Sequence, residues 1–169
     1  MRLAVPIALS TGVFALDQTT KRLAEAVFSE STRTVAVAPF FNLVLSHNRG
    51  ISFGLLRSEH AYAPYLLVLI ALTIMAGLAV WLWRSDSAIE RLGLSAILGG
   101  AVSNAVDRLE DGAVTDFLDF YVGAYHWPAF NLADTAIFCG VAALFFGSVW
   151  PKSTVKRPRA AENQERSLR

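Results

Sequence analysis

Aspartates stand at the edge of an apolar run near the end of the sequence. Asp134 directly precedes the run Thr135–Trp150, and Asp116 lies 18 positions before Asp134. Two carboxylates that face each other share a proton, because both cannot ionise cheaply at short range. One can then act as a base toward water and the other as an acid toward a carbonyl. These residue types therefore suggest hydrolysis of an amide bond without a metal.

The spacing alone does not select the partner of Asp134. The segment between Asp116 and Asp134 is long enough to close as a loop, but Asp119 or Asp107 could take the place of Asp116. Asn131 and Asp134 could also do no more than cap a helix and complement its dipole. A catalytic pair is therefore a hypothesis at this point, with Asp116 as the first choice of partner.

Other polar residues occur at helical spacing within apolar stretches. Asp17 and Lys21 are four positions apart and share a helix face, and Asn104 and Arg108 have the same spacing. Ionisable groups are costly in a membrane, where a functional site is their usual explanation. Asp107 and Arg108 could instead form an ion pair that stabilises the fold.

The composition indicates that the chain is a membrane protein. Of 169 residues, 54% are hydrophobic and 17% are charged, and the mean hydropathy is +0.43. Average soluble chains contain about 25% charged residues. The net charge of +1 indicates no nucleic-acid partner, and the three histidines show no metal-ligand spacing, so we expect neither metal nor cofactor. The single cysteine, Cys139, lies in an apolar run and is expected to be an inert, buried thiol.

Four apolar stretches predict a mainly α-helical, integral membrane bundle of four transmembrane helices, since about 20 apolar residues cross a bilayer. The predicted spans are residues 3–27, 62–83, 92–108 and 131–150. They form a single domain, residues 1–150, and a polar cytoplasmic tail at 151–169 is expected to be disordered. The first stretch resembles a cleaved signal peptide in part, but an amphipathic continuation follows it without a break.

Two outer loops connect these spans, at residues 28–61 and 109–130. Alternating β-branched and aromatic residues with turn signals predict a small β-containing unit at the membrane surface, between the first two helices. Lys and Arg number nine on the side of both termini and six on the other side. The excess places both termini in the cytoplasm and the aspartates near the outer face.

Several short motifs resemble those of the lipoprotein signal peptidase family, also called signal peptidase II, and they occur in the order found in that family. The motifs are Asp17-Gln18-x-Thr20-Lys21, Phe41-Asn42-Leu43 leading to Asn48-x-Gly50-x-x-Phe53, Gly99-Gly100-Ala101-x-x-Asn104-x-x-Asp107-Arg108, Val114-x-Asp116-Phe117, and Pro128-x-Phe130-Asn131-Leu132-Ala133-Asp134. Together they cover residues 14–138, and their combination is specific although each motif alone is weak.

The resemblance implies an aspartyl endopeptidase of the bacterial inner membrane with four helices and a periplasmic sheet. It implies removal of the signal peptide from prolipoproteins by cleavage just before a diacylglyceryl-modified cysteine. Asp116 and Asp134 match the family's catalytic pair. The family's supporting and substrate-binding residues match Asn48, Gly50, Asn104, Arg108, Asn131, Asp17 and Lys21. We further expect a monomer in contact with membrane lipids.

The chain departs from the family pattern in two motifs. The family usually shows Asn-Thr-Gly-Ala-Ala-Phe where this chain has Asn48-Arg49-Gly50-Ile51-Ser52-Phe53, so Arg49 and Ile51 depart from the motif. The family usually shows Gly-Asn where this chain has Ser103-Asn104. These departures leave the catalytic pair intact and bear on substrate preference and inhibitor fit.

Two other functions compete with a peptidase. The same charged residues could form a proton or ion path in a small transporter. Such a path needs polar groups through the full membrane, whereas the inner halves of the second and fourth predicted helices carry no charge. An assembly factor whose outer unit binds partners would leave Asp116 and Asp134 without a purpose.

Overall fold

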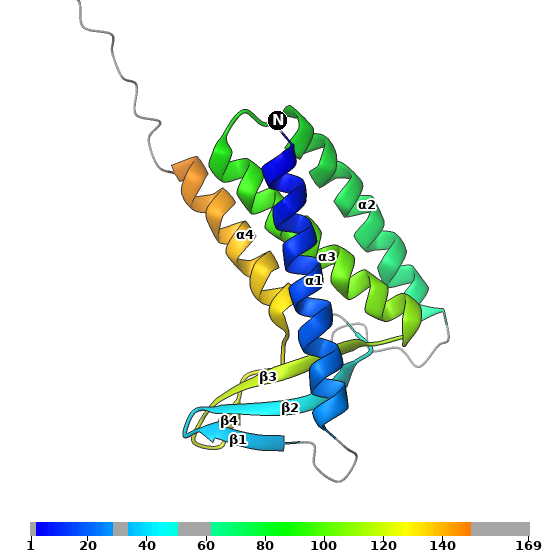
Figure 1. The fold of residues 1–169 in the computed structure, drawn as a ribbon, viewed down its shortest axis with the longest axis vertical. Coiled ribbons are helices and arrows are strands. Elements are labelled where there is room, and N and C mark those ends of the chain that lie inside the picture. The colour runs from blue at the N-terminus through cyan, green and yellow to red at the C-terminus, as the bar shows by residue number, and fades with distance from the viewer. Residues whose placement is uncertain (1–2, 29–33, 51–61, 150–169) are drawn as a thin grey trace, which may run out of the picture.

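The computed structural model describes residues 3–28, 34–50 and 62–149, which form four α-helices and one antiparallel sheet (Figure 1). The helices are α1 (Ala4–Val27), α2 (Ala63–Arg84), α3 (Ala88–Glu110) and α4 (Leu132–Val149). The strands are β1 (Thr34–Ala38), β2 (Phe41–Asn48), β3 (Val114–Val122) and β4 (Tyr125–His126), in the order β1-β2-β3-β4. Ile51 and the predicted tail at 151–169 lie outside the described residues.

The helices coincide with the four apolar stretches, and the largest difference is at the start of α3. This helix begins at Ala88 rather than at the predicted residue 92, because Ser87 caps it by accepting a hydrogen bond from the backbone nitrogen of Glu90. Within the described residues, α2 and α4 are long and apolar enough to cross a membrane. Helices α1 and α3 combine apolar stretches with charged residues, among them Asp17 and Lys21 on α1 and Asp107 and Arg108 on α3.

Helix α3 packs against the other three helices, and small residues allow its close approach to α4. A Cβ added to Gly140 would lie 2.5 Å from the carbonyl oxygen of Gly93, and one added to Gly100 would lie 2.5 Å from that of Ala133. Neither position can therefore accept a larger side chain without separating the helices. This contact brings the start of α4 next to the middle of α3, at Gly100.

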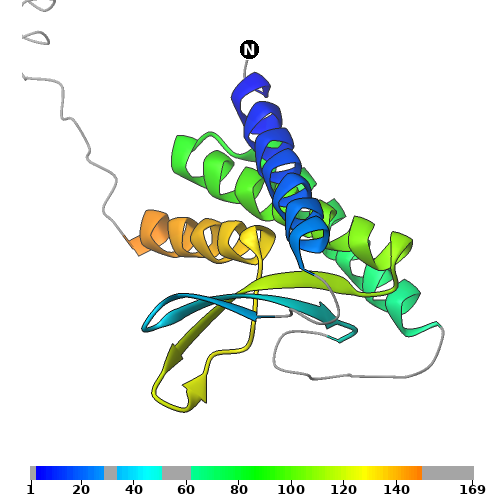
Figure 2. The same cartoon turned by 60° about the horizontal axis from the view of Figure 1, so that its bottom comes forward.

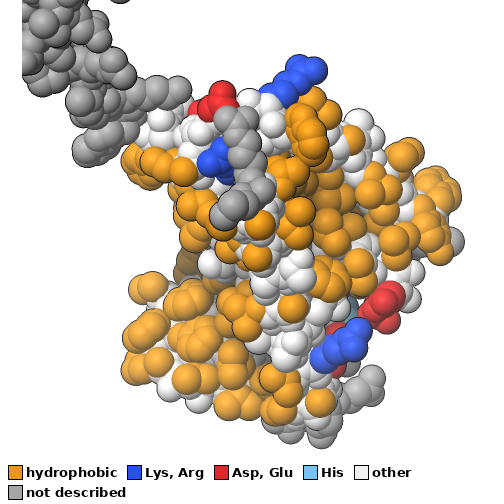
Figure 3. All heavy atoms as spheres, turned by 45° about the horizontal axis from the view of Figure 1, so that its top comes forward, with side chains coloured by type: hydrophobic (Ala, Val, Ile, Leu, Met, Phe, Trp, Pro, Cys, Tyr) orange, Lys and Arg blue, Asp and Glu red, His pale blue; other side chains and the backbone are white. Residues whose placement is uncertain are grey.

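The outward faces of the helices are covered with hydrophobic side chains (Figure 3). Exposed examples are Leu66 and Leu69 on α2 and Phe138 and Phe145 on α4. Cys139 is also exposed, so the prediction of a buried thiol is wrong. The reason is that α4 packs on α3 through the face that contains Ala133, Ile137 and Gly140.

The sheet lies across one end of the helices, and the N-terminus lies at the opposite end (Figures 1 and 2). Strands β1 and β2 belong to the predicted β-containing unit between the first two helices. Strands β3 and β4 come from the second outer loop, where the sequence predicts no strand. They join because β3 pairs with β2, with Asp116 opposite Ser46 and Asp119 opposite Asn42. The register shifts between these pairs, where β2 contains one residue more than β3.

Candidate active site

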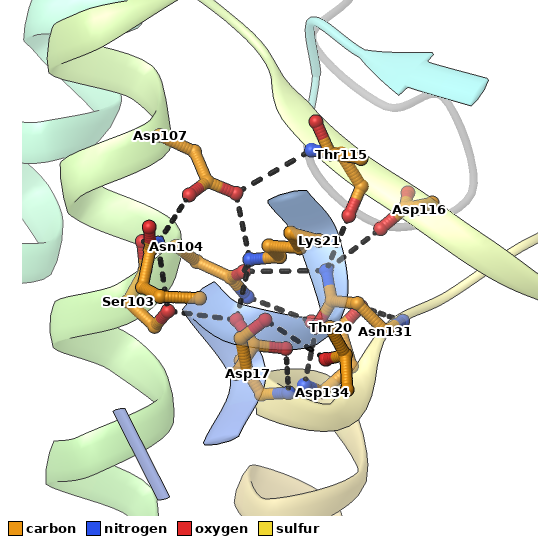
Figure 4. A network of polar contacts seen from close by, with 12 residues as sticks. Asp17, Thr20, Lys21, Ser103, Asn104, Asp107, Thr115, Asp116, Asn131 and Asp134 are labelled. Atoms are coloured by element: carbon orange, nitrogen blue, oxygen red, sulfur yellow. Dashed lines mark hydrogen bonds and ion pairs between the residues drawn. The ribbon is translucent and has the colours of Figure 1, made fainter. Parts of the chain in front are cut away.

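Asp116 and Asp134 come from different elements and bind the same asparagine (Figure 4). Asp116 lies on β3, and the side-chain amide of Asn131 donates to its Oδ1 at 2.8 Å. Asp134 lies in the first turn of α4, and the backbone nitrogen of Asn131 donates to its Oδ2 at 3.3 Å. Asn131 is fully buried between them, so its position links the two carboxylates.

The start of α4 explains how Asn131 serves both carboxylates. Its side-chain oxygen accepts a hydrogen bond from the backbone nitrogen of Asp134 at 2.9 Å, while Asp134 accepts from the backbone nitrogen of Asn131. This reciprocal pattern is a capping box. The capping role proposed from the sequence is therefore present, and it leaves the amide nitrogen of Asn131 free to reach Asp116. Capping and a catalytic pair are compatible at these positions.

The surroundings of Asp116 favour its protonated form. Burial raises the pKa of Asp116 to about 7, and the charge of Asp134 acts in the same direction. The hydrogen bonds from Asn48 and Asn131, together with the positive charge of Lys21, oppose the rise in pKa. A carboxyl group that is half protonated near neutral pH is suited to give a proton to a reacting oxygen.

Four supporting residues form a second connected group beside the carboxylates. The amide of Asn48 donates to Oδ2 of Asp116 at 3.2 Å, and its oxygen accepts from the backbone nitrogen of Gly50 at 3.0 Å. The guanidinium of Arg108 donates to the carbonyl oxygens of Gly50 and Asn104, each at 3.0 Å. Asn104 in turn donates to Oδ1 of Asp134 at 2.9 Å. The supporting residues predicted from the sequence therefore surround both carboxylates.

A buried ion cluster lies behind this group. The ammonium of Lys21 lies 2.6 Å from carboxylate oxygens of both Asp17 and Asp107, and it donates to the side-chain oxygen of Asn104 at 2.9 Å. Lys21 therefore positions the asparagine that binds Asp134. Asp107 pairs with Lys21, so the structure differs from the predicted ion pair between Asp107 and Arg108.

The departure at Ser103 has a structural role. Its hydroxyl donates to Oδ2 of Asp17 at 2.7 Å, a bond that glycine cannot make. The other oxygen of Asp17 accepts from the backbone nitrogen of Ala133 at 2.8 Å, which ties α1 to the start of α4. Arg49, the second departure within the described residues, is exposed.

The two alternative partners of Asp134 have other contacts. Asp107 belongs to the ion cluster, and Asp119 has hydrogen bonds to Asn42 and His126. Asp119 also lies three positions from Asp116 on β3, so the two side chains project from opposite faces of the strand. The geometry therefore favours Asp116 as the partner of Asp134.

An apolar cavity of about 490 Å³ opens beside Asp134. Its lining consists of Asn48, Trp127, Pro128, Ala129, Phe130, Asp134, Thr135 and Phe138. Asn48, Asp134 and Thr135 place polar atoms at a wall whose other residues are apolar, three of them aromatic. In the described part of the chain, no three His, Cys, Asp or Glu side chains lie close enough together to hold a metal.

Reasoning from the sequence missed Thr115 and Glu25. The hydroxyl of Thr115 donates to a carboxylate oxygen of Glu25 at 2.6 Å, and its carbonyl oxygen accepts from the amide of Asn131 at 3.4 Å. Thr115 thus fixes the strand next to Asp116. The sequence could have indicated Thr115, because it is the unspecified position of the motif Val114-x-Asp116-Phe117.

Sequence comparisons match the chain to a known family and to named relatives. The family described as signal peptidase (SPase) II matches residues 9–150. A lipoprotein signal peptidase of Beijerinckia indica subsp. indica is 44% identical over 76% of this chain and 78% of its own length. The lipoprotein signal peptidase of Methylobacterium sp. (strain 4-46) is 39% identical over 89% of this chain and 92% of its own length.

Two solved structures of bacterial membrane enzymes share the fold. Their TM-scores are 0.78 and 0.75, with 24% and 25% sequence identity. The matches cover 92% and 89% of this chain and 94% and 96% of the other chains.

The apolar helices, together with these named relatives, identify the protein as a membrane protease. More narrowly, the chain belongs to the signal peptidase II family of proteases.

Proposed function

We propose that this protein is an aspartyl endopeptidase of the bacterial inner membrane, that Asp116 and Asp134 are its catalytic residues, and that it cleaves prolipoproteins just before a diacylglyceryl-modified cysteine. The observation that carries the proposal is the binding of both carboxylates by Asn131 beside an apolar cavity. Relatives named lipoprotein signal peptidase support the substrate class.

The two carboxyl groups divide the chemistry between them. Asp134 accepts hydrogen bonds from Asn104 and from the backbone of Asn131, as suits an ionised base, and takes a proton from the attacking water. Asp116, whose pKa is raised, gives its proton to the carbonyl oxygen of the scissile bond. The oxygen of the water bonds to the carbonyl carbon and forms a tetrahedral diol. When the C–N bond breaks, Asp134 returns its proton to the leaving nitrogen and Asp116 recovers one from the diol.

The cavity suits the apolar part of a lipid-bearing peptide. Aromatic side chains from residues 127–130 and from α4 form its walls, and the polar atoms lie at the edge beside Asp134. The acyl chains already lie in an apolar medium in the membrane, so we propose that such walls position the lipidated substrate by packing contacts rather than by removing it from water. We propose that the enzyme acts as a monomer surrounded by membrane lipids.

The proposed orientation places the sheet on the periplasmic side and both termini in the cytoplasm, with all four helices crossing the membrane. The distribution of Lys and Arg supports it. A reporter enzyme that is active only outside the cytoplasm should be silent when fused after Arg169 and active when inserted within residues 29–61. The opposite pattern would reverse the orientation.

The deciding experiment is a cleavage assay with purified protein in detergent. A diacylglyceryl-modified prolipoprotein should be shortened at its cysteine, as seen by mass spectrometry, and the unlipidated precursor should be cut far more slowly. Asp116→Asn and Asp134→Asn should each abolish cleavage. The exposed Asp111, changed to Asn, is the matched control and should retain activity. Cleavage by both variants, or inhibition by a chelator that added zinc reverses, would refute the aspartyl mechanism.

A further inference from the structure

Asp119 is a buried carboxylate that the proposed chemistry does not use. Its side chain is only 9% exposed, and it lies on the face of β3 opposite Asp116. The amide of Asn42 on β2 donates to its Oδ2 at 2.9 Å. Nδ1 of His126 on β4 lies 3.0 Å from Oδ1 and 2.9 Å from Oδ2. An ionised carboxylate only accepts hydrogen bonds, so Nδ1 of His126 carries the hydrogen in this contact.

His126 stands at the start of a segment that forms one wall of the cavity. Residues 127–130 follow it directly and all four line the cavity beside Asp134. The segment is attached to β3 by backbone hydrogen bonds, from Trp127 to Phe120 at 2.8 Å and from Phe130 to Leu118 at 3.0 Å. The ring of His126 also stacks on Tyr121, with the centroids 4.9 Å apart.

The contact between Asp119 and His126 is a polar side-chain anchor of this short strand. Strand β4 has only two residues, Tyr125 and His126, and backbone pairing alone holds such a short strand weakly. His126 is 52% exposed, whereas its partner carboxylate is buried against the sheet. A hydrogen bond to a charged group is stronger than one between neutral groups. The contacts with both oxygens of Asp119 also fix the position of the imidazole ring.

We propose that Asp119 and His126 are positioning residues for substrate binding, because they hold residues 127–130 as the wall that contacts the apolar part of the lipidated substrate. The inference rests on the proposed function for the nature of the substrate. Since Asp119 projects away from Asp116, loss of the contact should weaken substrate binding and leave the chemical step intact. The expected signature is a raised KM with little change in kcat.

Variants at His126 separate the hydrogen bond from ring stacking. His126→Phe keeps a ring that can stack on Tyr121 but removes the donor, whereas His126→Asn removes the ring and keeps a donor near the position of Nδ1. For His126→Phe we expect KM for the lipidated prolipoprotein to rise about tenfold, the ratio expected from one charge-assisted hydrogen bond. For His126→Asn, which keeps a donor, KM should stay close to the wild-type value. Tyr125→Phe on the same strand is the matched control and should resemble the wild type.

A binding measurement keeps the inference testable apart from cleavage. In the inactive Asp134→Asn background, adding His126→Phe should raise the Kd for the lipidated peptide by about the same tenfold factor. Asp119→Asn should act like His126→Phe, and the two together should be no worse than either alone, because the residues act as one unit.

The possible results separate this inference from the proposed function. If the wild type does not cleave the lipidated prolipoprotein, the proposed function fails, and the Kd comparison alone decides the role of the pair. If the wild type cleaves and His126→Phe leaves both KM and Kd unchanged, the positioning role is wrong. A fall in kcat at constant KM would also overturn it, since the pair would then act on the chemical step.

Discussion

Replacement of Asp116 by asparagine should change how the stability of the protein depends on pH. The pKa of this carboxyl group is raised from 3.8 to about 7 in the folded protein, mainly by burial. Between these two values the folded state keeps a proton that the unfolded state has released. Stability therefore falls as the pH rises through this window, because the folded state binds more protons. The contribution is fully present below about pH 4 and is lost above about pH 7.

The size of the effect follows from the width of the window. Each pH unit between the two pKa values changes the free energy of unfolding by about 1.4 kcal/mol. Because the folded-state carboxyl group is already half ionised at pH 7, raising the pH from 5 to 7 should destabilise the wild type by roughly 2 kcal/mol through Asp116 alone. Asp116→Asn has no titrating group there and lacks this slope. Its absolute stability also reflects altered hydrogen bonds to Asn48 and Asn131, so the slope is the quantity to compare.

Thermal unfolding in one detergent provides the assay. The midpoint temperatures of the wild type and Asp116→Asn should be measured at pH 5, 6, 7 and 8, and the difference between the two proteins plotted against pH. The midpoint temperature of the variant should rise relative to that of the wild type up to about pH 7, and the difference should then become constant. A difference that is constant across the range would show that the pKa of Asp116 is not raised, and its role as a proton donor near neutral pH would lose its basis.

Four further predictions concern activity and packing. Cleavage should decline as the pH rises through about 7, because Asp116 loses the proton that it donates; a rate that keeps rising would contradict this role. The double variant Asp116→Asn with Asp134→Asn should be little worse than either single variant in the cleavage assay, since the pair acts as a unit. Lys21→Met leaves two buried carboxylates without their cation and should cost roughly 3–5 kcal/mol of stability, visible as a lower midpoint temperature. Gly140→Ala places a Cβ 2.5 Å from a carbonyl oxygen of α3 and should cost about 1–3 kcal/mol, whereas Gly77→Ala meets nothing within 4 Å and should not destabilise.

The helices could be predicted from the sequence, whereas half of the sheet could not. Long uninterrupted apolar stretches have one stable form in a membrane, and Ala63–Arg84 has no charge before its last residue. Strand β3 is rich in apolar and aromatic residues, but its two aspartates are three positions apart and break the alternation that marks a half-buried strand. Its strand character depends on pairing with β2, whose residues lie about 70 positions earlier. Pairing between distant segments is not visible in local sequence patterns.

Within the site, the residue types were predictable and their pairing was not. The motifs identified Asp107 and Arg108, but neighbours on a helix point in different directions, and Asp107 reaches Lys21 on another helix. Ser103 reads as a small helix-contact residue, although its hydroxyl binds Asp17. The exposure of Cys139 depends on which face of α4 packs on α3, and a helix that is apolar on all sides does not reveal that face.

The arrangement of the elements answers why carboxylates stand at the edge of a membrane helix. Asp116 belongs to a strand of the sheet outside the helices, whereas Asp134 belongs to the first turn of an apolar helix. Asn131 joins them at the boundary between the two. In the proposed orientation, water reaches the pair from the side of the sheet, and an acyl-bearing peptide reaches it through the cavity along α4. Moving either carboxylate one helical turn deeper would remove it from water, and moving it outward would separate it from a substrate held in the lipid. The boundary is therefore the one position at which both reactants of the hydrolysis can meet.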